Sequence, residues 1–80
     1  MKIKFKDYIF HSDKFLEISS IVSANSRAVG YTLLSLYESE AYANLDILTF
    51  LEAKYKEKKT SDELIESILE LISNGTISKN

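Results

Sequence analysis

Residues 60–75 read TSDELIESILELISNG and carry the clearest structural signature in the chain. Thr60 and Glu63 match a capping box, in which each side chain accepts a hydrogen bond from the other residue's backbone amide. At the other end, Asn74 and Gly75 can adopt the left-handed backbone conformation that terminates a helix. Between these signals, apolar residues recur at helical spacing on one face, namely Leu64, Ile65, Ile68, Leu69 and Ile72. The stretch therefore predicts an amphipathic helix.

Two further helices are predicted in the first half of the chain. The first covers residues 13–24, with Ser12 as its N-cap. The second begins near Arg27, after an interruption at residues 25–26 that can also cap it. Gly30 lies inside the second helix, where glycine costs roughly 1 kcal/mol relative to alanine. We expect another backbone to approach closely there and offset this cost.

A third helix is predicted to follow Asn44, which we take as its N-cap, with Asp46 in the first turn. Without this break, one helix would cover residues 27–58 and extend over about 45–50 Å. A helix of that length would overshoot a compact domain and favour a multimer. A second alternative is a short coiled-coil seam with heptad spacing, in which a buried Asn44 sets the register. That seam would comprise Leu34, Tyr37, Ala41, Asn44, Leu48, Leu51 and Tyr55.

The two ends of the chain are less strongly specified. Residues 2–6 alternate between lysine and apolar side chains, as a strand with one buried face does. Phe5, Tyr8 and Ile9 also fit a helical stripe, so residues 1–11 form either an arm or a short strand. A strand would need a partner near residues 76–78 or from a second chain. We otherwise expect residues 76–80 to be a frayed tail.

These patterns predict an all-α fold. We expect a single helical domain over residues 1–80, built as a small bundle of three to four short antiparallel helices, with or without a short extended N-terminal segment. The predicted core consists of the apolar residues that recur on the helical faces: Phe15, Ile18, Val22, Leu33, Leu36, Leu48, Leu51, Leu64, Ile68 and Ile72.

Composition narrows the classes of protein that fit. The chain has 80 residues, no cysteine, one histidine and a formal net charge of −2. A core this small supplies only about 3–5 kcal/mol of net stability, and neither a disulfide nor a thiolate metal site adds to it. We therefore expect association with a partner or a homodimer. No uncharged run is long enough to span a membrane, and we expect a cytoplasmic protein without cofactor or metal.

Catalytic patterns are sparse. No serine lies in a Gly-x-Ser-x-Gly elbow, and no glycine-rich loop could cradle a phosphate. His11, Asp13 and Glu17 are the residues from which an acid–base pair or metal site could be built, but nothing in the sequence orients them. We expect that the protein is not an enzyme.

Tyrosines suggest what the protein binds. A tyrosine buries a large ring while offering a hydroxyl, which suits protein interfaces. The candidate interface residues are Tyr31, Tyr37, Tyr42 and Tyr55. Our first hypothesis is a small, self-associating protein-interaction module of the phage or plasmid accessory, inhibitor or immunity type.

The second hypothesis is a small nucleic-acid-binding regulator. Its contacts would come from two groups of basic side chains, namely Lys2, Lys4 and Lys6 near the start, and Lys54, Lys56, Lys58 and Lys59 in the last turn of the third helix. Lysines bind phosphates and make affinity salt-dependent. Against this hypothesis, the later group also suits the negative end of a helix dipole, and the net charge supplies no global attraction.

Overall fold

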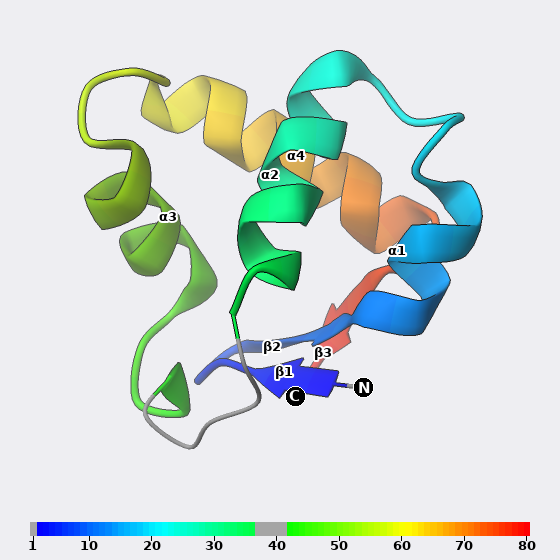
Figure 1. The fold of residues 1–80 in the computed structure, drawn as a ribbon. Coiled ribbons are helices and arrows are strands. Elements are labelled where there is room, and N and C mark those ends of the chain that lie inside the picture. Colours follow the sequence, from blue (N-terminus) through cyan, green and yellow to red (C-terminus); the bar gives the residue numbers. More distant parts are fainter. Residues whose placement is uncertain (1, 37–41) are drawn as a thin grey trace.

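The computed structural model describes residues 2–36 and 42–80, and these residues form an α+β fold (Figure 1). The elements are β1 (Lys2–Lys4), β2 (Tyr8–His11), α1 (Ser12–Ile18), α2 (Ala24–Leu34), α3 (Ile47–Tyr55), α4 (Ser61–Ser73) and β3 (Ile77–Lys79). The strands form one antiparallel sheet in the order β1-β2-β3, and the helices lie on one side of it. The prediction of an all-α bundle is therefore wrong.

The sheet joins the two ends of the chain. Ile3 pairs with Phe10, and Phe10 pairs with Ile77 on its other side. All three side chains are buried, so this cross-strand row is the face on which the helices pack. Residues 76–80 are not a frayed tail, because β3 completes the sheet. The strand predicted within residues 2–6 forms as β1, but its partner is β2, and the residues near 76–78 pair with β2 instead.

Backbone and side-chain hydrogen bonds secure β3 at both of its ends. The His11 amide donates to the Thr76 carbonyl at 2.8 Å. The Asn80 amide donates to the Asp7 carbonyl at 3.1 Å, and the Asn80 side chain donates to the Phe5 carbonyl at 2.9 Å. Each bond satisfies a main-chain group that would otherwise need water.

Local capping signals decide where the helices begin and end. The capping box of α4 is confirmed, with the Glu63 amide 3.2 Å from the Thr60 hydroxyl and the Thr60 amide 3.1 Å from the Glu63 carboxylate. Gly75 has a φ of +85°, as the predicted stop requires. The N-cap of α3 is Asp46 rather than Asn44, because Asp46 accepts from the Thr49 amide at 2.7 Å.

The other helix boundaries also differ from the prediction. Ser12 is the first residue of α1 rather than its cap, and α1 ends at Ile18. Ser23 caps α2 and accepts from the Ser26 amide at 3.2 Å. Because α2 ends at Leu34 and α3 starts at Ile47, the continuous helix over residues 27–58 does not form. The predicted coiled-coil seam is interrupted with it, and its Tyr37 and Ala41 lie outside the described residues.

The core mixes residues from helices and sheet. Seven predicted core residues are buried: Phe15, Val22, Leu33, Leu36, Leu51, Leu64 and Ile68. Ile18, Leu48 and Ile72 are only partly buried. The core residues that the prediction omitted come mainly from the sheet and from neighbouring helix positions, namely Ile3, Phe5, Phe10, Val29, Ile47, Leu71 and Ile77.

Gly30 has a clear packing role. A Cβ atom built on Gly30 would overlap the ring of Phe15, so α1 and α2 can approach only because no side chain is present. The close approach expected here is therefore made by an aromatic ring and not by another backbone. Tyr31 packs edge-to-face on the same ring, with centroids 5.1 Å apart.

Candidate protein-binding surface

An apolar groove of about 210 Å³ runs between the start of β2, α3 and α4. Its lining is mainly aliphatic: Asp7, Tyr8, Ile47, Leu48, Ile65, Ile68, Leu69 and Ile72. We refer to these residues as the α4 groove. Ile47 and Ile68 form its buried floor, so the groove is continuous with the core.

The rotation of α4 about its own axis creates this groove. The buried residues of α4 are Leu64, Ser67, Ile68 and Leu71, which centre the core face on Ser67 and Leu71 rather than on the predicted stripe. Ile65 and Leu69 are consequently turned outward, with 39% and 58% of their surfaces exposed. Exposed apolar side chains that continue into a groove are typical of interaction surfaces.

Asp7 is the acidic residue among those that line the groove, and it has a structural partner. Its carboxylate accepts a hydrogen bond from the Ile47 amide at 3.0 Å. Amides in the first turn of a helix lack intrahelical partners, so this bond helps to cap α3. Asp62 and Glu66 lie exposed on α4 outside the groove. The groove therefore offers an apolar surface beside an acidic helix face.

The predicted interface tyrosines lie elsewhere and make contacts within the chain. Tyr42 packs on Phe5 and Phe50, with ring centroids 5.9 and 5.4 Å away. The Tyr55 hydroxyl lies 2.7 Å from that of Thr32. Tyr31 is 48% exposed but packs on Phe15. Tyr37 lies outside the described residues. None of the described tyrosines in the prediction lines the α4 groove.

The two predicted lysine groups do not form one patch. Lys2 and Lys4 lie exposed on β1 and Lys6 just after it, at the bottom of Figure 1. The segment that follows α3 lies at the top of the same view. Lys54 in the last turn of α3 and Lys56 and Lys58 after it are exposed, whereas Lys59 donates to Asn25 at 2.9 Å and lies 5.5 Å from the Tyr55 ring centroid.

A polar hollow lies on another side of α4, next to the N-terminus of α2. Glu70 accepts hydrogen bonds from the Ser26 hydroxyl at 2.6 Å, the Ser23 hydroxyl at 2.8 Å and the Ser23 amide at 3.1 Å. These donors hold the pKa of Glu70 below its ordinary value of 4.5, and the Ser26 hydroxyl contributes most. The carboxylate thus ties α4 to the N-terminus of α2.

We expect Glu70→Gln to lower the free energy of unfolding at pH 7 by roughly 1–2 kcal/mol, because charge-assisted bonds become neutral ones. Because the pKa of Glu70 is lower in the folded than in the unfolded state, its ionised carboxylate stabilises the fold. This stabilisation is complete above pH 4.5 and is lost as the pH falls through the pKa of the folded state. The variant should therefore lose less stability on acidification below that pH. Urea unfolding across the pH range measures both effects. Glu66→Gln, one turn away and exposed, is the matched control.

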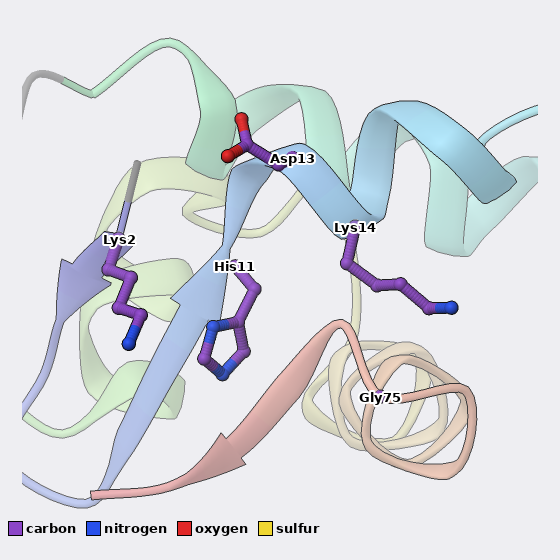
Figure 2. A pocket seen from close by; sticks show the side chains of 5 residues that line it. All are labelled: Lys2, His11, Asp13, Lys14 and Gly75. Atoms are coloured by element: carbon purple, nitrogen blue, oxygen red, sulfur yellow. The ribbon is translucent and has the colours of Figure 1, made fainter.

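His11 lies in a third hollow, away from the α4 groove. Lys2, His11, Asp13, Lys14 and Gly75 line it, and Figure 2 shows the side chains of Lys2 and His11 next to each other. The His11 Nε2 atom is 2.7 Å from the Ser78 hydroxyl. Glu17, which the sequence grouped with His11, instead lies 4.0 Å from the Lys14 ammonium group.

The described residues contain no group of three or more histidine or acidic side chains that could hold a metal ion. No helix in the same residues is both long and apolar enough to cross a membrane. Comparison with protein-family models, curated proteins and solved structures finds no match to this chain.

Proposed function

We propose that this chain is a non-catalytic protein-interaction module that associates with a second copy of itself through the α4 groove. The observation that carries the proposal is the outward position of Ile65 and Leu69, which extend the buried core onto the surface of α4. Covering them removes apolar area from water, which is the main driving force of protein association.

The spacing along α4 favours another α4 as the occupant. Ile65, Leu69 and Ile72 are separated by four and then three residues, which is the seam spacing of paired helices. A two-fold axis through Leu69 would place the two seams against each other, with the same residues contributed by both copies. Such isologous contacts are the commonest way in which small proteins form dimers.

Charge favours the antiparallel arrangement of the two α4 helices. Asp62 and Glu66 both lie in the N-terminal half of α4, outside the seam. Parallel pairing would bring the acidic residues of both copies side by side, and like charges in proximity are destabilising. Antiparallel pairing about Leu69 separates them along the interface. It also sets Ile65 of one copy near the C-terminal turn of α4 in the other.

We expect Leu69→Glu to weaken self-association at least about thirtyfold, since central apolar residues of interfaces contribute 2 kcal/mol or more. Sedimentation equilibrium over a concentration series measures the dissociation constant. Leu16→Glu is the matched control, because Leu16 on α1 is 55% exposed and lies outside the groove. Both variants should unfold as wild type does at a concentration where the protein is monomeric.

Two results would contradict the proposal. One is a wild-type protein that stays monomeric at the highest concentration tested. The other is an equal effect of Leu69→Glu and Leu16→Glu on the dissociation constant, which would place the interface outside the α4 groove.

A further inference from the structure

The outer face of the sheet carries a row of basic side chains. Lys2 on β1 pairs directly with His11 on β2, so both side chains leave the sheet on the same face. Lys4 lies two residues after Lys2 and is exposed on that face. The described helices lie on the opposite face (Figure 1), and the side chains of Lys2 and Lys4 are exposed. Lys2 and His11 therefore lie side by side on this face, where both can donate hydrogen bonds to an anion.

A hollow of about 370 Å³ adjoins this pair. Lys14 from α1 closes its other side, and its Cε atom would lie 3.9 Å from a Cβ atom built on Gly75. Asp13 also lines the hollow, but Figure 2 shows its carboxylate pointing away from the ends of Lys2 and His11. Lys2 and His11 border the hollow from the sheet and the stem of Lys14 borders it from α1, while Figure 2 shows the Lys14 ammonium group pointing away from Lys2 and His11.

His11 is held in place within this group. Its Nε2 atom lies 2.7 Å from the Ser78 hydroxyl, which fixes the ring relative to β3. By contrast, the contact between Lys14 and Glu17 is 4.0 Å long and exposed. Ion pairs of that kind contribute little, so Lys14 can turn toward a ligand at small cost.

We propose that this hollow binds a phosphate group, held by Lys2, His11 and Lys14. Lysine is a point-charge donor that suits phosphate oxygens, and a histidine N–H adds a directional hydrogen bond. The volume suits a phosphate with a small substituent, and the open sheet face also admits a phosphate that belongs to a longer strand. This inference does not depend on the α4 groove, which lies elsewhere on the surface.

NMR titration with inorganic phosphate, at an ionic strength kept constant with sodium chloride, tests the proposal. We expect saturable shifts of the backbone amides of Lys2, His11, Lys14 and Gly75. The double variant Lys2→Gln/Lys14→Gln should bind phosphate roughly tenfold more weakly. Lys54→Gln/Lys56→Gln makes the same charge change on exposed residues at the other end of the molecule and should bind as wild type does.

A short single-stranded oligonucleotide is the second probe, and it distinguishes the two sources of phosphate. Saturable shifts of the same amides with either probe support the site, and the tighter probe identifies the source. Linear shifts without saturation with both probes would overturn the proposal. An equal loss of affinity in the two double variants would also overturn it, because the effect would then reflect net charge alone.

Discussion

Removal of residues 76–80 should abolish cooperative folding. Ile77 is 1% exposed, and truncating a buried isoleucine to alanine alone costs about 2–5 kcal/mol. The deletion also breaks the bond from His11 to Thr76 and both bonds made by Asn80. Such losses exceed the roughly 3–5 kcal/mol that a core of this size supplies. Thermal unfolding followed by circular dichroism should show no transition for the deleted chain.

Two point variants separate the loss of β3 from a general effect of changing this end of the chain. Ile77→Ala should lower the unfolding temperature strongly, because it empties a position on the buried row of the sheet. Lys79→Ala changes an exposed residue of the same strand and should have little effect. A deleted chain that melts cooperatively near the wild-type temperature would show that residues 76–80 do not belong to the fold.

Gly30→Ala should destabilise the protein by about 2–3 kcal/mol, although alanine is the better helix former. The added methyl group would occupy space that the Phe15 ring now fills, so α1 and α2 would have to move apart. Ala28→Gly, two residues earlier on the exposed side of α2, is the control and should cost only about 1 kcal/mol through propensity. Urea unfolding measures both values.

A double-mutant cycle identifies the clash as the cause. In the Phe15→Leu background, Gly30→Ala should cost clearly less, because the smaller side chain leaves room for the methyl group. Additive effects in the cycle would contradict this account. They would mean that Gly30 and Phe15 influence stability independently.

Local chemistry made α4 predictable. The capping box at Thr60 and Glu63 and the stop at Gly75 are short-range signals, and the structure has them where the sequence places them. The break before α3 was also predictable, but the identity of its cap was not. Asn44 and Asp46 have similar cap propensities, and only the fold brings the Asp46 carboxylate to the Thr49 amide.

The alternation of residues 2–6 indicated a possible strand, but the sequence did not predict β2, β3 or the three-stranded sheet, because these strands are too short to carry a pattern. β3 has three residues, and a period of two cannot be recognised over so few positions. Its pairing with β2 joins residues 67 or more positions apart, which no local rule registers. The buried row of Ile3, Phe10 and Ile77 was consequently missing from the predicted core.

The candidate surfaces were only partly visible in the sequence. Helix α4 has more apolar residues than one face can bury, and this excess was the signal for the groove. Leu71, rather than Leu69, proved to face the core, because the rotation of a helix depends on what packs against it. The partnership of Lys2 with His11 followed from strand register, and the sequence alone did not specify that register.

The position of β3 also constrains how the protein is made. During translation β1 and β2 emerge first, and helices α1 to α4 follow before residues 77–79 leave the ribosome. Until then β2 lacks its pairing with β3, and the nascent polypeptide remains incompletely packed. Distant strand pairing of this kind slows folding and gives chaperones a period in which to act.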